Sequence, residues 1–355
     1  MGKTILVNGK ADTLKTKGVL FNEVEGMIKA GENVLMLDSK GEYYESFSQE
    51  FKDNGYNVVV VNLQDPEHSH GYNPYTLPLY YYKKGATDKA FELLEKVTYE
   101  IVKDDHKGDP FWINTTSDLF TGLSLLLFRE APEDKVNIGS LNVAVDVAGI
   151  SRDDKCHKYL ESLEVNDPIY VCTSGTLYAP NETRESIMSV AKQKIKPYCL
   201  REKLMSLLSH TDFDIVNVGK EKTAIFVIAR EDNNVTNAIA NILIEQIFSL
   251  VMFEKVKFNF ILDNLETIPY ITSLNSMIDM RSNNMKIYMA TRDLNIIKDV
   301  YGKPNLFANV DKIIQTPVDG MDAAVKENKP LELPENNYKP EYFDMNEFLT
   351  NYSNW

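Results

Sequence analysis

The stretch that most constrains the fold lies near the start of the chain, where an apolar run leads into a polar loop and then into a helical pattern. A phosphate-binding loop consists of a strand, then the sequence G-x-x-x-x-G-K-[ST], then a helix. Gly9, Lys15 and Thr16 have the spacing of its first glycine, its lysine and its hydroxyl. Leu14 stands where the second glycine turns backbone N–H groups onto the phosphates. The stretch therefore predicts a phosphate loop with one part replaced, although surface loops also produce this pattern.

The composition is that of an ordinary globular protein, with 43% hydrophobic and 25% charged residues. A length of 355 residues allows one large domain or two of ordinary size. The net charge of −14 argues against a general nucleic-acid binder. A local basic channel, or one formed only on assembly, is still compatible with this net charge. The three Cys show neither metal-ligand spacing nor an even count for disulfides, which favours a reducing compartment. The five His show no ligand pattern.

The first part of the chain alternates strand and helix patterns. Apolar runs at 5–7, 33–38 and 57–63 read as strands, and 16–29 and 42–54 read as helices. Continuous apolar strands are buried on both faces, which is typical of parallel sheets. We expect an open α/β sheet with helices on its faces.

The pattern changes after Gln64. Helical periodicity dominates 87–208, and strands return at 223–228, 258–263, 286–291 and 313–315, with helices at 236–253 and 271–281. We therefore expect an α/β domain formed by 1–82 and 211–317, an all-helical insertion at 83–210, and an irregular tail at 318–355. The N-terminus is already strand-like and no apolar run reaches about 18 residues, so we expect neither a signal peptide nor a membrane span.

Two strand ends carry candidate ligands. Asp263 ends an apolar strand and, together with Thr16, is typical of a Mg²⁺ site in nucleotide triphosphatases. Asn264 follows it, where a glutamate commonly activates water, and an amide cannot take up a proton there. Asp38 and Lys40 follow the second strand at the edge where open α/β sheets bind ligands.

Taken in chain order, these segments resemble the coupling proteins of type IV secretion, the conjugative DNA-transfer ATPases (TraG/TraD-like). The likeness spans 5–317. The matching segments are the turn Asp38-Ser39-Lys40-Gly41-Glu42 (with Ser for the family's Pro), the third strand and loop at 55–66 and 71–74, Asp109-Pro110-Phe111-Trp112, the strand 260–263, and 287–292 with Tyr301-Gly302.

The resemblance implies a RecA-like P-loop NTPase domain with an all-helical insertion, acting as a hexamer at the membrane. It also implies ATP with Mg²⁺, and as partners type IV secretion or relaxosome proteins, single-stranded DNA and inner-membrane components. The location implied is cytoplasmic, peripheral to the inner membrane. The site residues implied are Gly9, Thr13, Lys15, Thr16, Asp38 and Lys40 for nucleotide, Thr16 and Asp263 for Mg²⁺, and Arg281 as a candidate arginine finger.

Three departures from the family pattern fall on nucleotide chemistry: Leu14 for Gly, Asn264 for Glu, and Arg292 for Gln. The family's N-terminal membrane helices are also missing from this sequence. We therefore expect a degenerate member with weak nucleotide binding, very slow or absent hydrolysis and weak self-association in isolation. The alternatives are an active DNA-translocating ATPase, a pseudo-ATPase adaptor or scaffold that binds no nucleotide, and an α/β enzyme acting on another phosphate ligand.

Overall fold

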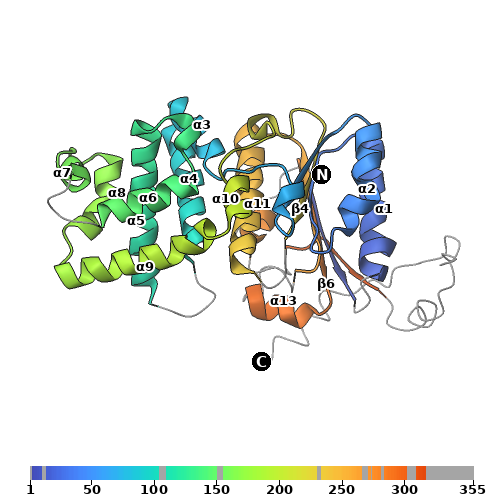
Figure 1. Ribbon diagram of the computed structural model, residues 1–355. Helices are drawn as coiled ribbons and strands as arrows, with labels where there is room; N and C mark the ends of the chain where they lie inside the picture. Colours follow the sequence, from blue (N-terminus) through green and yellow to red (C-terminus); the bar gives the residue numbers. More distant parts are fainter. Residues whose placement is uncertain are drawn as a thin grey trace, which may run out of the picture. The chain divides into compact units, whose positions relative to one another are not determined.

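The computed structural model divides into two compact units (Figure 1). The first comprises 1–59, 219–232 and 254–355, and the second 60–218 and 233–253. The residues that the structure describes are 2–9, 13–103, 109–149, 155–229, 233–265, 271–272, 274–280, 284–301 and 309–316. The predicted tail at 318–355 and Arg281 lie outside them.

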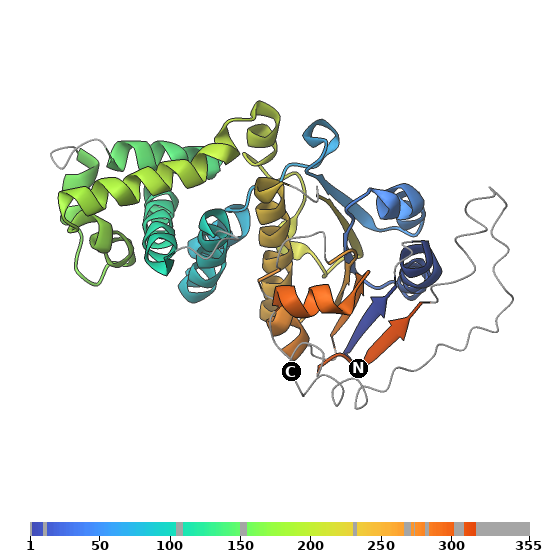
Figure 2. The same ribbon diagram turned by 90° about the horizontal axis from the view of Figure 1, so that it is seen from below.

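A parallel sheet organises the first unit (Figures 1 and 2). Within the described residues it has seven strands in the order β3-β4-β2-β5-β6-β1-β7. The predicted parallel α/β sheet is thus confirmed, and every predicted strand is present within two residues of its expected bounds. The strands are β1 (Lys3–Asn8), β2 (Val34–Leu37), β3 (Asn57–Asn62), β4 (Thr223–Ile228), β5 (Phe258–Leu262), β6 (Met285–Thr291) and β7 (Lys312–Gln315).

The order of the strands follows their apolar content. Every residue of β2, β4 and β5 is buried, whereas the outer strands β3 and β7 carry partly exposed residues. Leu37 at the end of β2 is in register with Leu262 at the end of β5, and Leu262 with Met289 of β6. Neighbouring strands therefore end at one edge, and the polar residues that follow them emerge side by side.

The helices of the first unit are η1 (Thr13–Leu20), α1 (Phe21–Ala30), α2 (Glu42–Asp53), α12 (Leu274–Asp279) and α13 (Leu294–Tyr301). The helix predicted at 16–29 begins earlier, and its first part is a π-helix, a form that is frequent at functional sites. Edge-to-face rings join α1 to α2 through Phe21 and Phe47, at 4.8 Å between centroids. The helix predicted at 271–281 is shorter and spans Leu274–Asp279, and ahead of it the Ile271 N–H bonds the Tyr301 hydroxyl at 3.3 Å.

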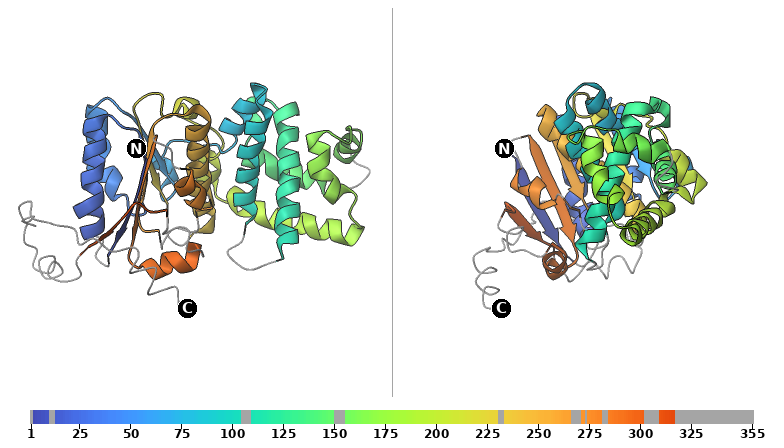
Figure 3. Two further views of the ribbon diagram at one scale, coloured as in Figure 1. Left: turned by 180° about the vertical axis from the view of Figure 1, so that it is seen from behind. Right: turned by 90° about the vertical axis from the view of Figure 1, so that its left-hand side faces the viewer.

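Helices make up the second unit (Figure 3), and α5 lies at their centre, in contact with α4, α6, α8 and α9. Side-chain caps start several of them: Asp109 accepts from Phe111 N, and Asp167 accepts from Ile169 N. No strand occurs in the described part of 87–207. The bounds of the all-helical insertion, 83–210, stay a prediction. The elements are η2 (Pro66–His68), α3 (Thr76–Lys83), α4 (Thr87–Val102), α5 (Pro110–Glu130), η3 (Glu133–Lys135), α6 (Ile138–Ala148), α7 (Lys155–Glu161), α8 (Pro168–Leu177), α9 (Asn181–Cys199), α10 (Glu202–Leu207), η4 (Ile215–Asn217) and α11 (Asn234–Glu254).

Helix α11 is long and apolar enough to cross a membrane, judged by length and composition. In the structure, 89% of its apolar window is buried inside the protein. That degree of burial is what the core helix of a folded domain shows, and α11 contains the whole helix expected at 236–253.

The turn after β2 is built around Asp38. Its Oδ2 accepts hydrogen bonds from the N–H groups of Tyr43 (3.0 Å) and Tyr44 (3.1 Å), which satisfies the first turn of α2. Gly41 precedes the helix at φ +80°, a backbone conformation that favours glycine. Burial raises the pKa of Asp38 to about 6, although the backbone N–H groups act in the opposite direction.

Gly26 in α1 and Gly31 directly after it should respond oppositely to replacement by alanine. Gly26 is inside the helix and nothing lies within 4 Å of an added Cβ, so Gly26→Ala should raise the free energy of unfolding by about 0.5–1 kcal/mol. Gly31 ends the helix at φ +68°, so Gly31→Ala should lower it by about 1–2 kcal/mol. Urea denaturation measures both, and changes of the same sign would contradict the assigned conformations.

The pKa of Asp38 predicts a pH effect on stability. In the unfolded chain the carboxyl loses its proton near pH 3.8, and in the folded chain near pH 6. Between these values the folded state holds more protons, so the Asp38 contribution to stability falls as pH rises, by roughly 3 kcal/mol in all. Asp38→Asn should remove this term. Urea denaturation from pH 4 to 7 should show wild type losing stability relative to the variant, and parallel profiles would contradict the prediction.

Candidate functional site

Gly9 leaves the end of β1 in a space that admits no side chain. Its N–H bonds the carbonyl of Thr291, at the end of β6, at 3.1 Å. A Cβ at position 9 would overlap the side chain of Thr316, whose own N–H bonds the Asn8 carbonyl at 2.8 Å. A glycine is needed because the chain passes between two neighbouring strand ends.

The structure brings Thr16 and Asp263 together. The Thr16 hydroxyl donates to Asp263 Oδ2 at 2.7 Å, and both residues are 2% exposed. Lys15 is fully buried beside them, and its charge is among the influences on the Asp263 carboxyl. Three of the predicted site residues therefore form one cluster, joining the start of η1 to the end of β5.

The Asp263 carboxylate sits in a strongly desolvated position. The pKa of Asp263 is raised overall, because burial outweighs the hydrogen bonds from Thr16 and Tyr43, the charge of Lys15 and the Asn264 N–H, which all lower it. Several donors and a neighbouring ammonium group thus offset only part of the cost of burying this carboxylate.

Tyr43 is a member of this cluster that sequence reasoning missed. Its hydroxyl donates to Asp263 Oδ2 at 3.0 Å, the same oxygen that accepts from Thr16. Burial, and then the Asp263 charge, raise the Tyr43 pKa well above its ordinary value, so the phenol stays protonated. The sequence signal for Tyr43 was its position in the first helical turn after the loop that contains Asp38. An aromatic residue at that position is equally typical of the hydrophobic core.

Asn264 adopts a left-handed backbone at φ +53°, which asparagine tolerates better than most residues. Its side-chain amide donates to Ser39 Oγ at 3.4 Å, and its N–H bonds Asp263 Oδ1 at 2.8 Å. The residue that follows Asp263 is therefore an amide that lies beside the turn after β2.

The other predicted residues are placed less directly. Asp38 uses its carboxylate on the α2 backbone, and Lys40 is exposed in the following turn. Thr13 begins the π-helix η1, and only its backbone is described. Contacts of Asp38, Lys40 and Thr13 with a nucleotide stay predictions, and the arginine-finger role of Arg281 falls outside the described residues.

The donor set of the cluster fits Mg²⁺ held together with phosphate. In the described part of the chain no group of three or more His, Cys, Asp or Glu side chains forms a metal cage. Mg²⁺ is commonly bound by one or two carboxylates plus substrate phosphates, and it prefers hard oxygen ligands. The Thr16 hydroxyl and the Asp263 carboxylate are such ligands, whereas a metal bound by protein alone would need more of them.

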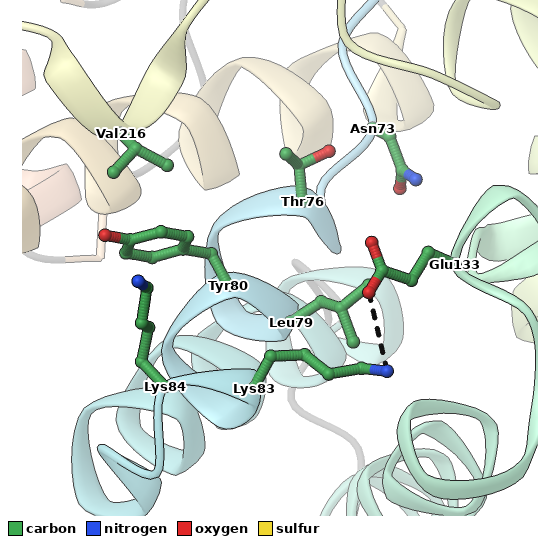
Figure 4. Close-up of a pocket in the computed structure, with 8 residues that line it drawn as sticks. All are labelled: Asn73, Thr76, Leu79, Tyr80, Lys83, Lys84, Glu133 and Val216. Atoms are coloured by element: carbon green, nitrogen blue, oxygen red, sulfur yellow. Dashed lines mark ion pairs between the residues drawn. The ribbon is translucent and has the colours of Figure 1, made fainter.

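A separate pocket of about 500 Å³ lies within the helical unit, and Figure 4 shows its lining. Two lysines reach it, and Lys83 pairs with Glu133 at 3.5 Å. The Lys84 ammonium lies 5.7 Å from the Tyr80 ring centre. None of the predicted site residues lines this pocket. The lining residues are Asn73, Thr76, Leu79, Tyr80, Lys83, Lys84, Glu133 and Val216.

Comparison with solved structures supports the fold. The unbound bacterial conjugative coupling protein TrwBdeltaN70 matches with a TM-score of 0.61 and 14% identity, over 90% of this chain and 71% of that chain. TrwB in complex with the ATP analogue ADPNP matches with 0.61 and 16%, over 91% and 73%. TrwB in complex with ADP and Mg²⁺ matches with 0.58 and 15%, over 88% and 69%. At this identity the likeness establishes a shared fold, which is RecA-like.

The sequence comparisons point the same way. No curated protein matches this chain. Residues 4–312 match the family described as "Type IV secretory system Conjugative DNA transfer". That match includes η1, α2, the helical unit and the strand that ends at Asp263. Because it covers most of the 355 residues, the chain belongs to the coupling-protein family of type IV secretion and conjugative DNA transfer.

Proposed function

We propose that this chain is a coupling-protein component of a conjugative DNA-transfer apparatus that binds Mg-nucleotide weakly and hydrolyses it very slowly or not at all. The observation that carries the proposal is the Thr16–Asp263 bond at 2.7 Å, with an amide in place of the neighbouring general base. The ligands for a metal are kept, while the group that would take a proton from water is not.

Nucleotide binding rests on the cluster at the strand ends. Lys15 would neutralise phosphate charge, and Thr16 and Asp263 would hold Mg²⁺. Mg²⁺, when bound, supplies positive charge that bridges phosphate oxygens. TrwB, which shares the fold, has been solved with ADP and Mg²⁺ and with an ATP analogue. Weak binding follows from Leu14, since the second glycine of the loop gives the backbone freedom that leucine restricts.

Slow hydrolysis follows from the chemistry of Asn264. Attack on phosphate needs an oriented water, and an amide can bond that water without accepting its proton. The side chain also donates to Ser39, which directs the amide group to the turn after β2. Arg292 adds a positive charge where the family carries a neutral Gln, and this charge favours retention of nucleotide over positioning of water.

Family membership supports the proposed setting. The partners are type IV secretion or relaxosome proteins, inner-membrane components and single-stranded DNA, at the cytoplasmic face of the inner membrane. The net charge of −14 opposes self-association of the isolated chain, so a hexamer would form on assembly with these partners.

Phosphate release with Mg-ATP and single-stranded DNA tests the hydrolysis proposal. We expect turnover far below one per second, since loss of a general base typically costs about 10²- to 10⁴-fold. Asn264→Glu should raise the rate at least about tenfold, and the added Lys15→Ala should abolish that gain. Wild-type turnover near one per second that Lys15→Ala abolishes would show an intact motor.

Calorimetry with Mg-ATP tests the binding proposal. We expect an affinity weaker than micromolar for wild type and a tightening of roughly fivefold in Leu14→Gly, equivalent to about 1 kcal/mol of backbone freedom. Leu14→Ala is the matched control, because it shortens the side chain without supplying that freedom. Micromolar or tighter binding by wild type would contradict the proposal, and absence of binding in all three proteins would favour the adaptor without nucleotide.

A further inference from the structure

We propose that Tyr43 is a positioning residue for the Mg²⁺ site, and that its phenol holds the Asp263 carboxylate in the orientation that receives the metal. This inference rests on the proposed function, because it concerns the same site. It assigns to the first turn of α2 a part in metal binding that the sequence motifs do not contain.

The Asp263 carboxylate is held at both oxygens. Oδ2 accepts from the Thr16 hydroxyl (2.7 Å) and from the Tyr43 hydroxyl (3.0 Å), and Oδ1 accepts from the Asn264 N–H (2.8 Å). Three donors on one carboxylate leave it little freedom to rotate. Thr16 uses its hydrogen in this bond, so the lone pairs of its oxygen stay available for a cation.

Tyr43 is itself fixed at three points. Its backbone N–H bonds Asp38 Oδ2 at 3.0 Å, and its ring meets the Phe21 ring edge-on at 5.1 Å. Its hydroxyl then reaches Asp263. Phe21 is the first residue of α1 and directly follows η1, which carries Lys15 and Thr16. The phenol therefore links the turn after β2 to the two candidate metal ligands.

The Tyr43 hydroxyl distinguishes a role in positioning the Asp263 carboxylate from a role in packing the core. A phenylalanine would fill the same space, keep the contact with Phe21 and spare the cost of burying a polar group. Tyr43 is 1% exposed, so its hydroxyl is not kept for contact with water. Groups that bond a metal ligand from behind orient it, and their loss typically weakens metal binding about 10- to 100-fold.

The test is ADP binding to the full chain by calorimetry, with Mg²⁺ and with EDTA. The quantity compared is the Mg²⁺-dependent gain in ADP affinity. In Tyr43→Phe this gain should shrink about tenfold, while the affinity in EDTA stays within about twofold of wild type. A residue that only supports the fold would change both affinities together or neither.

Tyr72→Phe is the matched control. Tyr72 is fully buried and its hydroxyl donates to Gln246 Oε1 at 2.9 Å, so the control also loses one buried hydrogen bond. The Mg²⁺-dependent gain should be unchanged in this variant. A loss equal to that of Tyr43→Phe would show a general effect of stability and would overturn the inference.

The outcomes separate this inference from the proposed function. If wild type gains affinity with Mg²⁺ and Tyr43→Phe gains as much, the role of Tyr43 is refuted while Mg-nucleotide binding stands. If wild type gains nothing from Mg²⁺, both are refuted. The inference is supported if the Mg²⁺-dependent gain in ADP affinity is smaller in Tyr43→Phe but not in Tyr72→Phe.

Discussion

The bond between Thr16 and Asp263 joins residues 247 positions apart in the chain, and the site depends on it. A carboxylate at the end of a fully buried strand must find donors inside the protein, because water does not reach it. The start of η1 supplies one donor and the first turn of α2 supplies another. The positions of both helices are thus tied to one charged group.

The parallel sheet makes this arrangement available. Its central strands are buried along their whole length and end in register, so their carboxyl ends deliver Asp38 and Asp263 to one edge. The two carboxylates have different roles. Asp38 accepts from the backbone of α2 and sets the start of that helix, while Asp263 accepts from the side chains of Thr16 in η1 and Tyr43 in α2.

The same geometry bears on the departures from the family pattern. Asn264 lies at φ +53° with its amide next to Ser39, so its position reflects both a backbone turn and a side-chain bond. A longer acidic side chain at this backbone angle would carry the steric cost of a left-handed residue. The amide at position 264 and the local turn are therefore parts of one structural feature.

Sequence reasoning predicted the parallel sheet, the helical block and the meeting of Thr16 with Asp263, because apolar runs, periodicity and motif spacing are local properties. It did not predict Tyr43. An aromatic residue in the first turn of an amphipathic helix reads as core, and nothing local reveals that its hydroxyl meets the carboxylate that directly follows β5. It also missed the π-helical start at Thr13 and the left-handed turn at Asn264. Strand order, register and ring packing decide which distant side chains meet, and they are settled only when the whole core closes.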